Sequence, residues 1–205
     1  MKKIIIAIIV VAVVGVGLTF YFLNQNKNSD NSSLETENLP VSEETANSPE
    51  RTTGLYVGDD FTIVSPKDWI QTHMQSTLVS FQNPDEKHPE GSAASKINFK
   101  SYIAVSFDNT QGKTLEEIAE LVKQQIQAVA PSVSFASETN EIIDGQPAKI
   151  MEANLNQQNA DFKVLMAVIA KEDKYFTISA NTTAQKWTEY SEIFYDSIRS
   201  FKFKK

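Results

Sequence analysis

The sequence predicts an α+β fold, in which an antiparallel β-sheet is flanked by helices on both faces, and it places one transmembrane helix before that domain. Three observations lead to this fold. Residues 4–23 carry no charge. Residues 161–170 alternate between two apolar faces, as a strand covered on both sides would. Residues 114–131 and 183–200 each place apolar side chains at helical spacing, so we expect them to be the two covers.

Residues 1–23 are the predicted cytoplasmic tip and membrane anchor. Twenty helical residues span roughly 30 Å, which is the thickness of the hydrocarbon core of a bilayer. Lys2 and Lys3 precede the apolar run, and Lys27 is the only nearby cation after it. The positive-inside rule therefore predicts a single-pass protein of the cell membrane, with its N-terminus in the cytoplasm and everything after Leu23 extracytoplasmic.

A cleaved signal peptide is the competing interpretation of the same residues. Gly15-Val16-Gly17 offers small side chains at a suitable spacing, but the apolar run continues beyond them to Leu23, which favours retention. The chain has no cysteine, which excludes a lipid-modified cysteine, disulfides and thiolate chemistry.

Residues 24–53 are predicted to be a disordered acidic linker. They hold six acids and two bases, they are rich in Asn, Ser, Thr and Glu, and they have too few apolar side chains to offset the entropy of ordering. Residues 54–205 are predicted to be one extracytoplasmic domain, with twenty acids and fifteen bases. Because both parts are acidic, nucleic acid is not an expected partner.

The first half of the domain is predicted to consist of short strands and one long loop. Residues 61–64 are a strand that a Ser-Pro pair ends, and residues 70–74 and 77–82 are two more strands around a tight turn. Residues 83–95 hold two prolines and a glycine and are predicted to be a loop. Residues 96–108 are predicted to be a strand with one buried face. That face consists of Ile97, Phe99, Ile103, Val105 and Phe107.

The second half begins with a helix and continues with strands. Thr114 and Glu117 form a capping box in front of an amphipathic helix that Pro131 ends. Residues 133–143 and 146–155 are predicted to pair as a hairpin through Asp144-Gly145. Two further strands follow, at residues 161–170 and 174–181, before the last helix.

This order of elements resembles the PsbP-like domain family over Leu55 to Phe203. The resemblance is carried by Phe61-Thr62-Ile63 followed by Ser65-Pro66-Lys67-Asp68-Trp69, by Asp144-Gly145-Gln146-Pro147-Ala148, and by Ile198-Arg199-Ser200-Phe201 at the end of the last helix. It implies an α/β/α sandwich and a tendency to bind protein partners, since characterised members are assembly or interaction factors. It supplies no catalytic residue, and the anchor departs from the chloroplast-lumen and nuclear settings of those members.

Catalytic signatures are absent from the sequence, so we expect no enzyme activity and no catalytic, cofactor-binding or metal-binding residues. GxSxG, SxxK, HExxH and Gly-rich phosphate loops do not occur. The chain has two histidines, His73 and His88. His88 lies in the loop from Asp85 to Glu90, where oxygen and nitrogen ligands are close together. A divalent metal site there is weighed against a solvated loop, and the solvated loop is favoured.

The sequence thus predicts a membrane-tethered extracytoplasmic module that binds or assembles with an envelope protein. The alternative is a small-ligand carrier or hydrolase that uses a cleft between sheet and helix, with polar groups converging around His73, Tyr102 or Tyr175. A third hypothesis is a plain spacer. Asn31-Ser32-Ser33 and Asn181-Thr182-Thr183 match the glycosylation pattern, which is a weak signal.

The anchor predicts how the protein behaves on fractionation. The intact chain should stay with cell membranes during washes in high salt and should be released by detergent, because an apolar helix is held by the bilayer rather than by charge. Immunoblots of the fractions measure this. Release of the full-length chain by salt alone, or its recovery from the cytosol, would show that residues 4–23 do not span the membrane.

Overall fold

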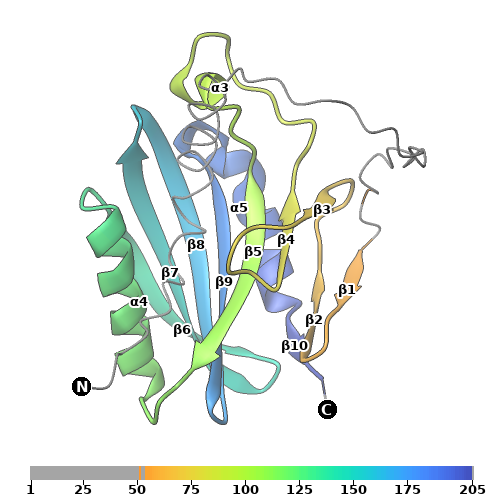
Figure 1. Cartoon of the computed structure of the whole chain (residues 1–205), viewed down its shortest axis with the longest axis vertical. Coiled ribbons are helices and arrows are strands. Elements are labelled where there is room, and N and C mark those ends of the chain that lie inside the picture. Colours follow the sequence, from red (N-terminus) through yellow and green to blue (C-terminus); the bar gives the residue numbers. More distant parts are fainter. Residues whose placement is uncertain (1–50, 52–53, 205) are drawn as a thin grey trace, which may run out of the picture.

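The computed structural model describes residue 51 and residues 54–204. In chain order the elements are β1 (Leu55–Val57), β2 (Phe61–Val64), β3 (Ile70–Thr72), β4 (Val79–Gln82), α3 (Ala93–Lys96), β5 (Tyr102–Asn109), α4 (Leu115–Val129), β6 (Ser134–Ile143), β7 (Gln146–Gln157), β8 (Ala160–Lys171), β9 (Lys174–Thr183), the 3-10 helix η2 (Ala184–Lys186), α5 (Trp187–Arg199) and β10 (Lys202–Phe203). Seven strands form one antiparallel sheet in the order β3-β4-β5-β9-β8-β7-β6. The other three form a smaller sheet, β1-β2-β10. Helices α4 and α5 lie on opposite sides of the large sheet (Figure 1).

Strand β8 has apolar side chains on both faces, as predicted, and each face has its own core. On one face Phe162, Val164, Met166 and Val168 cluster with Ile118, Val122 and Ile126 of α4. On the other face Leu165, Ala167 and Ile169 cluster with Tyr190, Phe194 and Ile198 of α5. The inference that a strand apolar on both sides needs two covers is therefore confirmed.

Tight turns connect the four long strands β6 to β9. The predicted turn at Asp144-Gly145 is present, and both residues have positive φ angles of 50° and 75°. Gln158 and Asn159, between β7 and β8, also have positive φ angles, of 52° and 61°. Two-residue loops of this kind match the right-handed twist of the strands they join. Residues 134–183 therefore form a continuous run of hairpins.

The capping box in front of α4 is formed as predicted. Thr114 Oγ1 accepts a hydrogen bond from the Glu117 amide at 3.3 Å, and the Thr114 amide donates to Glu117 Oε2 at 2.8 Å. These two bonds satisfy amides that the first turn of a helix leaves free. The same bonds hold the pKa of Glu117 below its ordinary value, the hydrogen bond from the Thr114 backbone being the largest cause.

Removal of the cap should destabilise the domain. Thr114→Ala leaves the Glu117 amide without its side-chain acceptor, and we expect a loss of about 1 kcal/mol in the free energy of unfolding. Urea denaturation followed by tryptophan fluorescence measures this loss. Thr188→Ala is the control, because Thr188 is an exposed residue inside α5 with no capping role. Equal stability of the two variants would contradict a contribution from the capping box.

The small sheet joins the two ends of the domain. Strand β2 pairs with β1 on one side and with β10 on the other. Phe61 stacks on Phe201 with ring centroids 5.2 Å apart. Ser197 Oγ of α5 donates to the Val64 carbonyl at 2.7 Å, and the Val64 amide donates to Ser200 Oγ at 2.8 Å. The strand at residues 61–64 is confirmed, but its separate sheet was not predicted, since β1 and β10 are too short to leave a pattern.

The strand predicted at residues 96–108 is wrong at its start and in its burial. Lys96 ends the short helix α3, and β5 begins only at Tyr102. Asn98 has a φ of 48°, which an extended strand does not allow. Tyr102, Ala104 and Ser106 are buried like Ile103 and Val105, so this part of β5 is covered on both sides. Phe107, predicted to lie on the buried face, is 40% exposed. The alternation was misleading because serine and alanine are small enough to be buried in the sheet.

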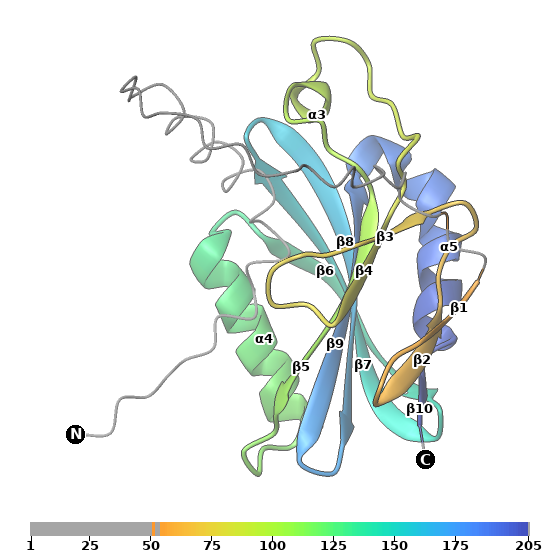
Figure 2. The ribbon, with the colours of Figure 1, turned by 45° about the vertical axis from the view of Figure 1, so that its right-hand side comes forward.

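Two other strands are shorter than predicted. Strand β3 ends at Thr72 rather than at residue 74, and β4 begins at Val79 rather than at residue 77. Residues 73–78 form a turn instead, in which Ser76 has a φ of 63° and the Thr77 amide donates to the Met74 carbonyl at 3.2 Å. This turn projects over β5 on the same side as α4 (Figure 2), and Met74 packs there against Tyr102 and Ala104.

The predicted anchor at residues 4–23 and almost all of the linker at residues 24–53 lie outside the described residues. Within the part of the chain that the structure does describe, no helix is both long and apolar enough to cross a membrane.

Candidate functional site

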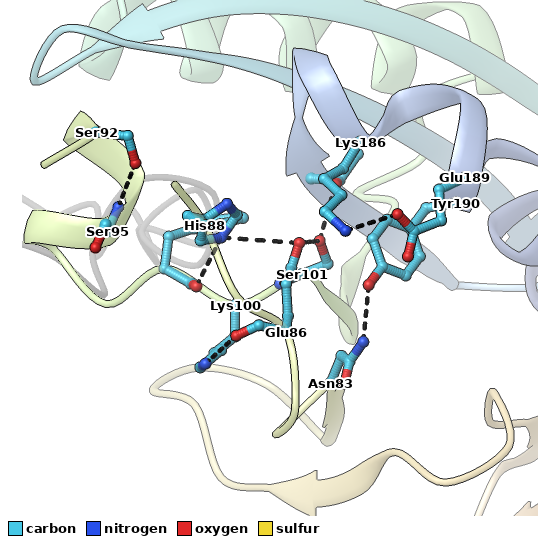
Figure 3. Close-up of polar contacts among 12 residues, drawn as sticks. Asn83, Glu86, His88, Ser92, Ser95, Lys100, Ser101, Lys186, Glu189 and Tyr190 are labelled. Carbon is cyan, nitrogen blue, oxygen red and sulfur yellow. Dashed lines mark hydrogen bonds and ion pairs between the residues drawn. The ribbon is translucent and has the colours of Figure 1, made fainter. Parts of the chain in front are cut away.

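The loop between β4 and β5 brings a buried polar cluster to one end of the large sheet (Figure 3). Glu86 is its centre and is 3% exposed. Ser101 Oγ donates to Glu86 Oε1 at 3.0 Å, and the Ser101 amide donates to Glu86 Oε2. Ser101 Oγ is also 2.8 Å from Thr182 Oγ1 of β9, and Lys100 Nζ donates to the Glu86 carbonyl. We call Glu86, His88, Ser101 and Thr182 the loop cluster.

His88 belongs to the loop cluster, but in the described structure it forms no hydrogen bond to the hydroxyl groups of the cluster, those of Ser101 and Thr182. His88 Nε2 is 3.0 Å from the Phe99 carbonyl and 3.8 Å from Glu86 Oε1. Both side chains are almost completely buried. The expectation of a solvated loop from Asp85 to Glu90 is therefore wrong for Glu86 and His88, although Asp85, Lys87 and Glu90 are exposed.

The order of contacts in the loop cluster does not suit nucleophilic catalysis. In a catalytic triad the imidazole lies between the hydroxyl and the carboxylate and takes the hydroxyl proton. Here the carboxylate of Glu86 lies between Ser101 and His88. Among the described residues no three His, Asp or Glu side chains are grouped so as to hold a metal ion. What the cluster does in this geometry is fasten the loop to β5 and β9.

Further contacts hold the same loop from two sides. Asn83 Nδ2 donates to the hydroxyl of Tyr190 in α5 at 2.7 Å. Asp85 Oδ2 accepts from Arg51 at 2.7 Å, and Arg51 also donates to the Asp68 carbonyl at 3.0 Å. The hydrogen bond from Arg51 lowers the pKa of Asp85 from its ordinary value. The chain thus enters the domain beside this loop.

The structure does not bring together the three residues proposed to surround a cleft. His73 is exposed just beyond β3. Tyr102 and Tyr175 are buried, but Tyr102 lies opposite Asn181 while Tyr175 lies opposite Asp108, six residues along the same strand pair. That separation is about 20 Å. Burial, reinforced by Asp108, raises the pKa of Tyr175 to about 12, and burial also raises the pKa of Tyr102. Neither phenol is suited to act as a base at neutral pH.

Starting two residues after Tyr175, β9 presents a line of small polar side chains toward the α4 side of the sheet. We call Thr177, Ser179, Asn181 and Thr183 the β9 row. These side chains are between 3% and 9% exposed. Asn181, the acceptor of a possible glycosylation pattern, is 3% exposed inside a strand and is inaccessible to a transferase in the folded domain. The other pattern, at Asn31, lies outside the described residues.

Exposed apolar side chains gather on the small sheet. Leu55 and Val57 of β1 are 63% and 57% exposed, and Val64 of β2 is 43% exposed. Leu55 lies directly opposite Val64 in the strand pair. We call Leu55, Val57 and Val64 the β1 patch. The patch begins a few residues after Arg51, where the chain enters the domain.

Comparison with known proteins decides the family. The PsbP family model matches residues 55–203. The chain belongs to the PsbP family. This match confirms the predicted resemblance, and the seven-stranded antiparallel sheet with its helices is a PsbP-like α+β fold. No curated protein matches the sequence of this PsbP-family chain.

Three solved structures are similar to this PsbP-family domain. The solution structure of CyanoP, the cyanobacterial PsbP of Synechocystis sp. PCC 6803, has a TM-score of 0.56 and 14% identity and covers 81% of this chain and 99% of its own. LpqN of Mycobacterium tuberculosis, which is involved in cell envelope biogenesis, has a TM-score of 0.54 and 10% identity, with coverages of 82% and 90%. A Pseudomonas aeruginosa protein of unknown function has a TM-score of 0.51 and 14% identity, with coverages of 71% and 93%. At these identities the likeness is one of fold.

Sequence reasoning missed the loop cluster and the β1 patch. The contact between Glu86 and Ser101 joins residues fifteen positions apart across a loop that has no periodicity. The loop holds three acids, Asp85, Glu86 and Glu90, and nothing in the sequence indicates that Glu86 is the buried one. The β1 patch was missed because a strand of three residues is shorter than any pattern that can be counted.

Loss of the Glu86 carboxylate should destabilise the PsbP domain. Glu86→Ala leaves the Ser101 amide buried without its acceptor and deprives the Ser101 hydroxyl of one partner, and each buried group left unsatisfied costs about 1–3 kcal/mol. Urea denaturation measures the change. Glu90→Ala, at an exposed position of the same loop, should stay within about 0.5 kcal/mol of the wild type. If both variants are as stable as the wild type, Glu86 does not hold the loop.

Proposed function

We propose that this PsbP-family chain is a membrane-tethered, extracytoplasmic module that binds or assembles with another protein of the cell envelope and has no catalytic activity. Membership of the PsbP family supports a binding role. The uncharged run at residues 4–23 supports the location. LpqN, which shares the fold, is involved in cell envelope biogenesis. The observation that carries the proposal is the β1 patch, an exposed apolar surface at the edge of a sheet.

The hydrogen bonds around β1 show which of its main-chain groups face outward. The Ser65 amide donates to the Gly54 carbonyl at 2.9 Å, and the Gly58 amide donates to the Phe61 carbonyl at 2.9 Å. Hydrogen-bonded and non-hydrogen-bonded pairs alternate along an antiparallel ladder. Leu55 and Val57 therefore occupy non-hydrogen-bonded positions, and their N–H and C=O groups point away from β2.

Strand β1 therefore offers a partner both main-chain and side-chain contacts. The outward N–H and C=O groups of Leu55 and Val57 can pair with an extended strand of the partner, and the exposed apolar side chains can fill shallow pockets beside it. Natural proteins usually protect such edges with charge or proline, and β1 itself has neither. Asp59 and Asp60 follow β1 and are exposed, so the chemistry favours a partner segment that is apolar and not acidic.

The alternative of a hydrolase has no supporting geometry in the described residues, because Glu86 separates Ser101 from His88. The carrier alternative needs a cleft around His73, Tyr102 or Tyr175, and the two tyrosines lie six residues apart along the same strand pair.

Photo-crosslinking at β1 tests the proposed function. A photoreactive phenylalanine analogue placed at Val57 of the full-length chain should capture an envelope protein in intact cells, which mass spectrometry of the adduct identifies. The same analogue at Thr139 in β6, an exposed residue of an edge strand in the large sheet, is the control. Leu55→Asp should lower the yield at Val57 by about tenfold, because central contacts of an interface cost more than 1 kcal/mol when lost. No adduct at Val57, or the same adducts at both sites, contradicts the proposal.

A further inference from the structure

Strand β6 is the longest strand at an edge of the two described sheets. The edge strands are β3 and β6 in the large sheet and β1 and β10 in the small one. β6 has ten residues, whereas β3 and β1 have three each and β10 has two. Natural proteins protect such edges by making them short or by placing proline or lysine on them, and β6 contains neither residue. This edge is therefore open to pairing with another strand.

The turn between β6 and β7 fixes which main-chain groups of β6 point outward. Ile143 borders the two-residue turn and forms a hydrogen-bonded pair across it. The next pair joins Ile142 to Pro147, which has no N–H to donate, so this pair is not hydrogen-bonded. Because the two kinds of pair alternate along the ladder, the N–H and C=O groups of Glu138, Asn140 and Ile142 point away from β7.

The two glutamates of β6 are held by cations of the domain itself. Glu138 Oε2 lies 3.0 Å from Lys123 Nζ of α4, and Glu138 Oε1 lies 3.4 Å from Lys149 Nζ of β7. On the other face Glu141 accepts hydrogen bonds of 2.8 Å and 3.0 Å from Arg199 of α5. The hydrogen bonds from Lys123 and Arg199 are the largest causes that lower the pKa values of the two glutamates. Both carboxylates are thus drawn onto the faces of the sheet, where neither blocks the edge.

We propose that β6 pairs with β6 of a second copy of this chain, in an antiparallel arrangement with Asn140 on the two-fold axis. In this register Glu138 of each copy pairs with Ile142 of the other, and Asn140 pairs with Asn140. Each pair exchanges two main-chain hydrogen bonds, so every outward N–H and C=O group of these three residues is satisfied. A shift by two residues brings either the bulge after Phe135 or the turn at Asp144 into the pairing and loses a pair.

The side chains of β6 suit pairing with an identical strand. Asn140 is exposed, and its amide both donates and accepts, so the two copies can bond each other across the axis. Neither glutamate meets a like charge, since Glu138 faces Ile142 and Glu141 faces the hydroxyl of Thr139 on the other side of the sheet. Ile142 is the most exposed large apolar side chain among the described residues, at 69%, and pairing removes part of it from water. Because both copies use the same edge, association closes at a dimer.

The proposed dimer leaves the β1 patch free. The strand of the small sheet next to the β6–β7 turn is β10, since the Phe203 amide donates to Asp144 Oδ2 at 2.9 Å. β1 lies on the far side of that sheet (Figure 1). The inference therefore does not depend on the envelope partner proposed for β1. A second copy captured at Thr139 differs in mass spectrometry from an envelope protein captured at Val57, so the two proposals fail or hold independently.

Disulfide trapping in the full-length chain tests the pairing and its register. The chain contains no cysteine, so a single introduced cysteine gives an unambiguous product. In Asn140→Cys the two α-carbons across the axis should be about 5.5 Å apart, within the range that a disulfide spans. The protein in detergent micelles, oxidised with copper phenanthroline, should therefore yield a covalent dimer on non-reducing gels.

Thr139→Cys is the matched control at the neighbouring exposed position. Thr139 faces Glu141 of the second copy, so the two Thr139 positions are offset along the strands and their α-carbons are about 8 Å apart, too far for a disulfide. Its trapping should be at least about tenfold slower than that of Asn140→Cys, because the strands must first separate or slip. Association through another part of the chain would trap both cysteines at similar rates. Similar rates, or no covalent dimer of Asn140→Cys, would overturn the inference.

A proline at Ile142 tests the hydrogen bonds of the edge. The N–H of Ile142 points away from β7, so Ile142→Pro removes a bond to the second copy without breaking one inside the domain. In the Asn140→Cys chain it should slow trapping about tenfold, whereas Ile142→Val should not. Trapping that Ile142→Pro leaves unchanged would also overturn the inference. Urea denaturation shows whether the proline variant is folded, and if it is not, the comparison of Asn140→Cys with Thr139→Cys decides alone.

Discussion

The burial of both faces of the central strands is the constraint on which this fold depends. Leu165, Ala167 and Ile169 of β8 would be exposed without α5, and Val164, Met166 and Val168 would be exposed without α4. At about 25 cal/mol per Å² of apolar surface, neither face can be left in water. The sheet is therefore stable only when both helices are packed against it, and the connections in the domain must place each helix on its own face.

The secondary features serve that constraint. The capping box at Thr114 begins α4 where its apolar stripe meets β7 and β8. The small sheet ties the end of α5 to β2 through Ser197 and Ser200. The loop cluster fastens residues 83–101 across the end of β5 and β9, which places the buried carboxylate of Glu86 among hydroxyl and amide donors. These stabilising contacts lie away from the β1 patch, so the exposed side chains of the patch are not needed to hold the fold together.

Long periodic segments could be predicted from the sequence, and short or irregular ones could not. Both helices and the two faces of β8 follow from patterns that span ten residues or more, and the turn at Asp144-Gly145 follows from its dipeptide. The start of β5 was wrong because Ile97 and Phe99 continue an apolar alternation through residues that are not a strand, and nothing local reveals the left-handed conformation of Asn98. Glu86, Ser101 and Thr182 meet only through tertiary contacts, so their spacing in the sequence does not indicate that they are close together. The loop from Asp85 to Glu90 was predicted to be solvated because of its composition, and composition does not distinguish a solvated acid from a buried one.

The pairing of β2 with β10 has a consequence for a chain that is synthesised from its N-terminus onward. β2 lies near the beginning of the domain and β10 at its end, so the small sheet cannot close until the last residues have emerged. The hairpins of residues 134–183, which have the most local contacts and should fold fastest, also emerge late. Until those later strands are present, β2 lacks its pairing with β10 and β5 lacks its pairing with β9. The last residues of the domain therefore complete its fold, and a chain that stopped before Lys202 would leave one edge of β2 without its strand partner.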